Sequence, residues 1–259
     1  TARRHGVFFR DMLFSPVRGA AKVSWKKEIW PFQWRIAVSW LSGYFIFQLF
    51  VPVLFSTRGP VEAGRMGFGL AIANALIGVP VAWLNTKTPR FGELIARRDY
   101  ARLDHMFMTT LSVTVIVIVF GGGALSVLDY AIYSYHLHLA DRLLEPVPFT
   151  MLMLATIVNF VTIAEAAYLR AHKEEPFLYV SLLSGVTIGT ITVSTAGRYG
   201  SIGIMAGYLC VSIVIGLGWG SFIFFSRRRD YQSRASASVT TDEVAADVPS
   251  LGLRKEADI

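Results

Sequence analysis

The chain is poor in charge and in cysteine. Of its 259 residues, 17% are charged and only one, Cys210, is a cysteine, whereas a soluble domain carries about 25% charged residues. A single thiol excludes an intramolecular disulfide and a four-cysteine zinc site. Because Cys210 lies in an apolar stretch, we expect it to be a small core residue. The shortage of charge excludes a disordered chain and a soluble enzyme with a single core.

The sequence also lacks the common catalytic and cofactor motifs. It has no Gly-rich loop followed by Lys-Ser or Lys-Thr, no His-Glu-x-x-His and no Gly-x-Ser-x-Gly, which are the signatures of ATP, zinc-hydrolase and serine-hydrolase sites. His136 and His138 lie near Asp141, but histidines two residues apart share a face only on an extended segment. We therefore expect a protein that is not an enzyme and has no cofactor and no metal site.

What the chain does have is long apolar segments. Apolar residues make up 53% of the sequence, and the mean hydropathy is +0.48. A membrane-spanning helix needs about 20 predominantly apolar residues, and Arg35 and Glu165 are the only charged residues in six windows of that length. These windows are 34–55, 66–84, 106–128, 147–168, 176–196 and 202–225. The sequence therefore predicts an all-α polytopic membrane protein with six transmembrane helices.

The basic residues lie mostly on one side of the predicted membrane domain. Only Arg58, Arg65, Arg142 and Arg198 fall on the opposite side, so the positive-inside rule places both termini in the cytoplasm. It also explains the net charge of +7 without a nucleic-acid partner. We expect a basic cytoplasmic segment at 1–33, a membrane domain at 34–225 and a disordered cytoplasmic tail at 226–259. The loop 85–105 has apolar residues near helical spacing and predicts a short helix on the membrane surface.

Charged residues inside or beside the spans are candidate functional groups, because intramembrane charge is costly unless it is paired or hydrated. Glu165 lies five residues before Arg170. Glu165 either reaches the inner interface or pairs with a neighbouring cation, or it faces a water-filled cavity, with Arg170, as a coupling or gating group. Arg35 and Arg65 lie at the ends of the first two spans. Each is either an interfacial anchor or a phosphate ligand, since Arg matches phosphate geometry.

Polar residues within the first two spans add to these candidates. Gln48 and Asn74 need hydrogen-bond partners in an apolar medium, and Tyr44, Pro52 and Pro80 indicate helices that bend. These residues fit either a transport path or hydrogen bonds between helices.

Small residues recur in the last two spans. Gly-x-x-x-Gly occurs at Gly185/Gly189, at Gly203/Gly207 and at Gly216/Gly220. This spacing lets two helix backbones approach closely. It predicts close packing of the last two spans, with a dimer face as the alternative.

Several stretches resemble bacterial oligosaccharide flippases of the multidrug/oligosaccharidyl-lipid/polysaccharide exporter superfamily. The first is WKKEIWPFQWR at 25–35, which runs into WLSGYF at 40–45. AGRMG at 63–67 is similar to the opening of the family's next span, and WLNTKTPRFG at 83–92 to its cytoplasmic exit. YLRAHKEEPF at 168–177 resembles the loop between two later spans.

The resemblance covers about residues 20–226 and implies a lipid-linked oligosaccharide flippase with two six-helix lobes around a central cavity. This chain would be the C-terminal lobe, and its partners would be the substrate, membrane lipid and either the missing N-terminal lobe or a second copy. The first two helices of each lobe help to line the family's cavity, which corresponds to 34–55 and 66–84 here. Arg35 and Arg65 would then meet the lipid pyrophosphate, while Gln48, Asn74 and Tyr44 would lie along the path.

We therefore expect a carrier that moves polyprenyl-pyrophosphate-linked sugar units across the cell inner membrane for surface polysaccharide assembly, such as O-antigen or exopolysaccharide. A drug/cation antiporter of the same superfamily is one alternative, which would carry more intramembrane carboxylates. A membrane glycan polymerase or ligase subunit is another, which would carry a large outer loop with catalytic groups. A structural subunit is the third.

Overall fold

The computed structural model describes residues 30–172 and 176–246, and the chain divides into two units, Thr1–Trp34 and Arg35–Ile259. Everything reported below lies in the second unit, apart from the first residues of its first helix. The described residues are helical, without strands. In chain order the elements are α2 (Trp30–Arg58), α3 (Pro60–Ala96), α4 (Tyr100–Ser134), η2 (Ala140–Arg142), α5 (Pro146–Ala171), α6 (Leu178–Val211), η3 (Ser212–Trp219) and α7 (Gly220–Ala246).

The predicted all-α class and the membrane character agree with this structure. Among the described residues, five helices are long and apolar enough to cross a membrane: Gln33–Arg58, Pro60–Ala96, Tyr100–Ser134, Pro146–Ala171 and the 56-residue Leu178–Ser233. The first four correspond to the first four predicted windows. The last two windows, 176–196 and 202–225, fall within the single long helix.

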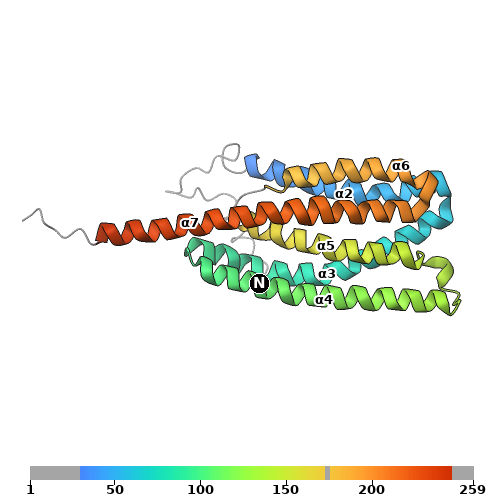
Figure 1. Cartoon of the computed structure of the whole chain (residues 1–259), viewed down its shortest axis with the longest axis horizontal. Coiled ribbons are helices and arrows are strands. Elements are labelled where there is room, and N and C mark those ends of the chain that lie inside the picture. The colour runs from blue at the N-terminus through green and yellow to red at the C-terminus, as the bar shows by residue number, and fades with distance from the viewer. Residues whose placement is uncertain (1–29, 173–175, 247–259) are drawn as a thin grey trace, which may run out of the picture. The chain divides into compact units, whose positions relative to one another are not determined.

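This long helix folds back on itself at Gly200. The backbone there has φ 58° and ψ −143°, which is not helical. A Cβ atom on Gly207 would lie 2.2 Å from Cγ2 of Ile191, although sixteen helical residues span about 24 Å. The two arms on either side of Gly200 therefore run back along each other, as Figure 1 shows at the end of α6. The predicted close packing of the last two apolar segments is confirmed at Gly207.

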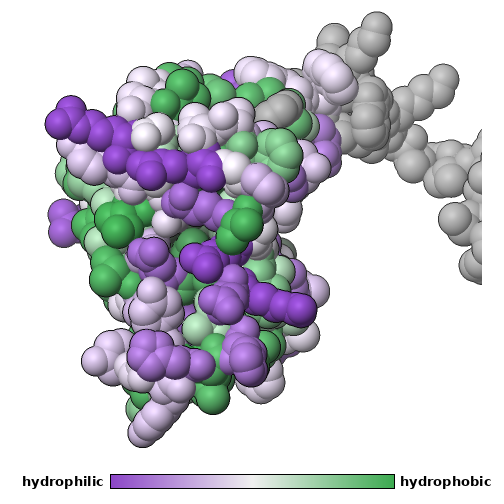
Figure 2. Space-filling model, turned by 90° about the vertical axis from the view of Figure 1, so that its right-hand side faces the viewer, coloured by the Kyte–Doolittle hydropathy of each residue, from purple (hydrophilic) through white to green (hydrophobic). Residues whose placement is uncertain are grey.

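Glu62 of α3 fixes this turn. Its Oε1 atom accepts a hydrogen bond of 2.7 Å from the backbone N–H of Ser201, the first residue after the turn. A carboxylate at this position also interacts favourably with the positive end of the helix dipole. Arg58 adds a second contact to the same region, because its Nε donates to the carbonyl of Ala196 at 3.3 Å. Hydrophilic side chains gather over this end of the bundle (Figure 2).

α5 is the central helix of the bundle. It contacts α3, α4, α6, η3 and α7, and Figure 1 shows it among these helices. The apolar core has two halves, and α5 contributes to both: Phe149 and Leu152 to one, Phe160 and Leu169 to the other. Side chains that α5 presents to its neighbours are therefore inside the protein, whatever surrounds the bundle.

Two predictions about the chain outside the spans are wrong. The loop 85–105 does not form a separate surface helix, because α3 continues to Ala96 and α4 begins at Tyr100 after a short turn. The predicted disordered tail 226–259 is helical as far as Ala246. Hydropathy detects where an apolar segment ends, which is not always where the helix ends. No Gly or Pro interrupts the chain between Ser221 and Val248, so no residue there stops the helix. The predicted segment 1–33 lies almost entirely outside the described residues.

The expected core position of Cys210 is also wrong, because its side chain is exposed. In a membrane bundle the residues that face lipid are as apolar as those in the core. An apolar window therefore does not tell the two faces of a helix apart.

We expect Gly200→Ala to lower the midpoint of thermal unfolding of the protein in detergent. A Cβ atom at position 200 would lie 2.5 Å from Oε1 of Glu62, and backbone conformations of this kind cost non-glycine residues about 1–3 kcal/mol. Gly197→Ala is the matched control, because a Cβ atom there meets no atom within 4 Å. Equal midpoints for the two variants would contradict the role of Gly200 in the turn.

Candidate functional site

A line of polar side chains winds around α5. We call it the α5 seam and define it as Asn159, Thr162, Glu165 and Tyr168. Successive members are three residues apart, which is a rise of about 4.5 Å along a helix. Each step of three residues also turns the line by about 60° around the helix, so Asn159 faces α6 and η3, Glu165 faces α7 and Tyr168 faces α4. The α5 seam runs from the middle of the bundle to the end that carries the α3–α4 turn.

The first part of the α5 seam is a neutral cluster around Asn159. Its Nδ2 lies 2.8 Å from the carbonyl of Ala155, 2.7 Å from the hydroxyl of Tyr208 and 3.2 Å from Oγ of Ser212. Tyr208 and Ser212 are both buried. The ring of Tyr208 packs edge-on against Phe47 and Phe50 of α2. Asn159 therefore joins three helices by hydrogen bonds that need no charge.

The backbone opposite this cluster is a π-helix, η3. Such segments are rare and occur often at functional sites. Ser212 begins η3 and bonds to Asn159, and a Cβ atom on Gly216 would lie 3.5 Å from Oγ1 of Thr162. The irregular backbone thus lies directly against the α5 seam.

Glu165 is the buried acid of the α5 seam. Its side chain is 4% exposed, and Oε1 accepts a hydrogen bond of 2.7 Å from the hydroxyl of Ser221 on α7. The buried Oε2 has no hydrogen-bond partner among the described residues. Glu165 therefore points across the bundle toward α7. The interpretation that it reaches the inner interface or pairs with a neighbouring Lys or Arg is wrong.

Arg170 lies near the end of α5 and is half-buried. It is not the partner of Glu165, whose one hydrogen bond comes from Ser221. The five-residue spacing already disfavours a contact, because side chains that meet on one helix are three or four residues apart. A coupling or gating role of Glu165 and Arg170 stays a prediction, and it does not depend on a contact between these two side chains.

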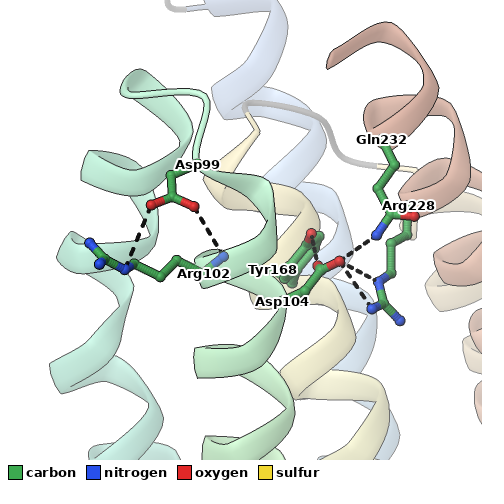
Figure 3. A network of polar contacts seen from close by, with 6 residues as sticks. All are labelled: Asp99, Arg102, Asp104, Tyr168, Arg228 and Gln232. Atoms are coloured by element: carbon green, nitrogen blue, oxygen red, sulfur yellow. Dashed lines mark hydrogen bonds and ion pairs between the residues drawn. The ribbon is translucent and has the colours of Figure 1, made fainter. Parts of the chain in front are cut away.

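The α5 seam ends in a charged network around Asp104 of α4, drawn in Figure 3. Oδ1 of Asp104 accepts a 2.7 Å hydrogen bond from the hydroxyl of Tyr168. Oδ2 accepts a hydrogen bond of 3.1 Å from Nε of Arg228 and forms an ion pair with its Nη2 at 3.0 Å. The side-chain amide of Gln232 donates a further hydrogen bond to the same oxygen. Asp104 is buried. One carboxylate thus ties α4, α5 and α7 together where α7 leaves the bundle.

Aromatic rings cover this network. The imidazole of His172 stacks on Tyr231 with ring centroids 4.2 Å apart and an angle of 4° between planes. Tyr168 packs against Phe107 and Phe224 at 4.9 Å and 5.3 Å. The rings exclude water from the Asp104 bonds, which strengthens them.

Sequence reasoning missed Asp104, because it lies just outside an apolar window among many charged residues. One signal was available: the acid is four residues C-terminal to Tyr100 and three before Phe107, so it shares a helix face with one partly buried and one buried aromatic residue.

The candidates from the first two spans lie apart from the α5 seam. Arg35, Tyr44 and Gln48 of α2 are exposed, and so is Asn74 of α3. Tyr44 and Gln48 are one helical turn apart on the same side of α2. The structure therefore places these four residues on the surface of this chain.

Arg65 is partly buried at the opposite end of the bundle from Asp104. Its Nε donates a 3.0 Å hydrogen bond to the backbone carbonyl of Asp141 in η2. This bond holds the connection between α4 and α5 against α3. His136 and His138 of the same connection are exposed, and the described residues contain no group of three or more His, Cys, Asp or Glu that could hold a metal ion.

Comparison with known proteins gives no relative. No protein-family model matches the chain, and neither a curated protein nor a solved structure is significantly similar to it.

We expect Asp104→Asn to lower the free energy of unfolding by about 1.5–3 kcal/mol, because hydrogen bonds to a charged group contribute about that much. Denaturation in mixed detergent micelles measures the change. Asp99→Asn is the control: Asp99 forms an exposed contact with Arg102 (Figure 3), and such pairs contribute about 0–1 kcal/mol. Asn also keeps the cap that Asp99 gives to α4.

The double variant Asp104→Asn/Arg228→Gln separates the charge pair from the rest. If the ion pair makes the main contribution, the double variant loses much less free energy of unfolding than the sum of the losses in the two single variants. If the two losses simply add, Arg228 and Asp104 act independently, contrary to the network described here.

Proposed function

We propose that this chain is one six-span lobe of a carrier that flips polyprenyl-pyrophosphate-linked oligosaccharide across the cell inner membrane. The resemblance of residues 25–45, 63–67, 83–92 and 168–177 to oligosaccharide flippases supports the substrate class. The sugar head would cross through a hydrated path while the lipid tail stays in the bilayer, and no covalent bond would be made or broken.

The proposed six spans are α2, α3, α4, α5 and the two arms that meet at Gly200. The first arm, Leu178–Tyr199, is about 33 Å long at 1.5 Å per residue, which is enough for the hydrocarbon core of a bilayer. The turns with few basic residues all lie at the end that holds Gly200. The positive-inside rule then puts that end outside and both chain termini in the cytoplasm.

The observation that carries the proposal is the exposure of two amides at membrane depth. Gln48 and Asn74 lie well inside the first two spans, and both side chains are exposed. Neither has a hydrogen bond to the rest of the described chain. An amide facing hydrocarbon without a partner is costly, so this surface fits contact with water or with another polypeptide. A hydrated cavity between this lobe and a second one would provide both the water and the second polypeptide.

Transport by rocking requires two bundles that move against each other, as in carriers built from repeats. The second bundle is either a further six-helix lobe or another copy of this chain. Arg35 is exposed near the start of α2, and in this proposal it would meet the pyrophosphate at the cytoplasmic entrance. Arg65 is committed to the Asp141 carbonyl, so we assign it to the outer end as a positioning residue.

Glu165 is the proposed coupling group. It is the buried acid of a seam that faces α7, and one of its oxygens has no partner among the described residues. Binding or release of a cation at this carboxylate would change its bond with Ser221, and with it the contact between α5 and α7. The π-helix η3, directly before α7, offers a segment of backbone that can change its register.

A cation-coupled antiporter of the same superfamily is the second candidate. An antiporter would need more buried carboxylates than Glu165 alone. Among the described residues, Asp104 and Asp129 are also buried. Oδ2 of Asp129 has no partner among the described residues. Asp104, in contrast, is fully occupied by Tyr168, Arg228 and Gln232, which fits a structural role.

We expect single cysteines at Ser134 and Tyr199 to react with a membrane-impermeant thiol reagent added to intact cells. Cysteines at Arg97 and Ser233 should react only after the membrane is opened. The four variants are made in a Cys210→Ala background, because Cys210 is itself exposed. The reverse pattern would overturn the proposed orientation.

We expect the chain, co-expressed with the coding region directly upstream of it, to restore surface polysaccharide to a flippase-deficient bacterium. Asn74→Leu and Glu165→Gln should each lower the restored polysaccharide at least severalfold at equal protein level in the membrane. Thr190→Val is the control, because its exposed hydroxyl is already bonded to its own helix.

Two outcomes would count against the flippase. If Asn74→Leu and Glu165→Gln both restore surface polysaccharide fully, the proposed substrate path and the proposed coupling group lose their support. Drug resistance in an efflux-deficient strain, together with no restored polysaccharide, would favour the antiporter.

A further inference from the structure

A pocket of about 310 Å³ opens between α3 and α4, close to the turn that joins them. It lies on the outer surface of the bundle and takes no part in the α5 seam. Its walls combine aromatic, basic, hydroxyl and apolar groups: Trp83, Lys87, His105, Met106, Thr109, Thr110 and Val113.

Polar groups from both helices line this α3–α4 pocket. The ammonium of Lys87 lies over the ring of Trp83, 5.3 Å from its centre. Nδ1 of His105 lies 3.3 Å from Oγ1 of Thr109. Trp83 is 53% exposed, so its ring forms an open wall of the pocket. A cation, an imidazole and a hydroxyl directed at one space are suited to a phosphate group.

Lys87 differs from three of the four arginines near this turn. Arg90 and Arg97 both pair with Glu93, and Arg102 contacts Asp99. No carboxylate pairs with Lys87 or with Arg98 in the part of the chain that the structure describes. Of these two, only Lys87 lines the pocket, so its charge is available to a ligand there.

The depth of the pocket fits one end of a lipid molecule. Trp83 and Met106 lie at the ends of the second and third apolar windows, where aromatic residues meet the headgroups. Lys87 lies one turn farther toward the cytoplasm. Val113 lies two turns farther into the span. The pocket thus passes from a basic mouth at headgroup level to an apolar floor at the level of the acyl chains.

We propose that the α3–α4 pocket binds one anionic phospholipid of the cytoplasmic leaflet. Lys87 and His105 contact the phosphate, Thr109 donates a hydrogen bond to it, and an acyl chain lies along Trp83, Met106 and Val113. Basic pockets between transmembrane helices on the cytoplasmic side are typical sites for anionic headgroups. The site does not depend on the proposed transport activity, only on the cytoplasmic position of the α3–α4 turn.

The size of the pocket favours a membrane phospholipid over the transported substrate. Its volume is at the lower limit for small-molecule sites, which suits one headgroup and leaves no room for a diphosphate that carries several sugars. The pocket also opens at the bundle surface, where bulk lipid reaches it without any conformational change.

The test uses the whole chain purified in detergent and phospholipids with brominated acyl chains, which quench nearby tryptophan. Brominated phosphatidylglycerol should quench a saturable fraction of the fluorescence, and brominated phosphatidylcholine should not. In Lys87→Gln/His105→Gln the apparent affinity for phosphatidylglycerol should fall at least about fivefold, the effect expected for the loss of one basic contact. Trp83→Phe should remove most of the saturable quenching.

Arg229→Gln is the matched control, because it removes one exposed charge from α7 and does not line the pocket. Lys87→Arg should keep the affinity within about twofold, which separates lost charge from a damaged fold. Inorganic phosphate at millimolar concentration should not compete, whereas a soluble short-chain phosphatidylglycerol should. Equal loss in Arg229→Gln and Lys87→Gln/His105→Gln would overturn the site in favour of unspecific surface charge. Competition by phosphate alone would overturn the lipid assignment in favour of a free-anion site.

Discussion

The arrangement of this bundle depends on one requirement, that polar groups inside an apolar protein find partners. α5 carries four such groups, and three of them bond to neighbouring helices. Asn159 bonds to Tyr208 and Ser212. One oxygen of Glu165 accepts a hydrogen bond from Ser221, while the other has no partner among the described residues. Tyr168 reaches Asp104, which in turn holds Arg228. α7 can make these contacts only if the chain returns along α5, and the turn at Gly200 with Glu62 at its corner permits that.

The contacts along α5 are of unequal strength. Those around Asn159 join neutral groups and contribute about 0.5–1.5 kcal/mol each, whereas those around Asp104 involve charges and contribute about twice as much. α7 is therefore held most firmly at the end that leaves the bundle and less firmly at η3. The π-helix η3 lies at the end where the contacts with α5 are weaker. Its backbone is already displaced from the regular α-helical register. Any movement of α7 against α5 is then expected to pivot near Asp104 and to displace η3.

Hydropathy was enough to predict the helical class and the first four apolar helices. It could not predict which face of each helix is internal, since lipid and core select the same apolar residues. This is why Cys210 was expected in the core and is exposed, and why the sequence left Glu165 open between the interface and the interior of the bundle. Hydropathy did not predict the helix ends either. Both α3 and α4 extend beyond their apolar windows as far as the turn at Arg97, and α7 extends to Ala246. Asp104 gains its importance from Arg228, 124 residues away, which no local pattern indicates.

The polar residues of this protein thus fall into two sets with different consequences. Most of the internal set is bonded within the chain and explains how the bundle is held together, although one oxygen each of Glu165 and Asp129 has no partner among the described residues. The external set, which includes Gln48, Asn74 and Lys87, is not paired with polar groups or carboxylates of the described chain. In a membrane these groups are costly unless something outside the chain satisfies them. Gln48 and Asn74 lie at mid-span, where only water in a cavity or another polypeptide can do so. Lys87 lies at headgroup level, where a lipid phosphate can. The depth of each unpaired group therefore determines the kind of partner it requires, and the two proposals follow from that single distinction.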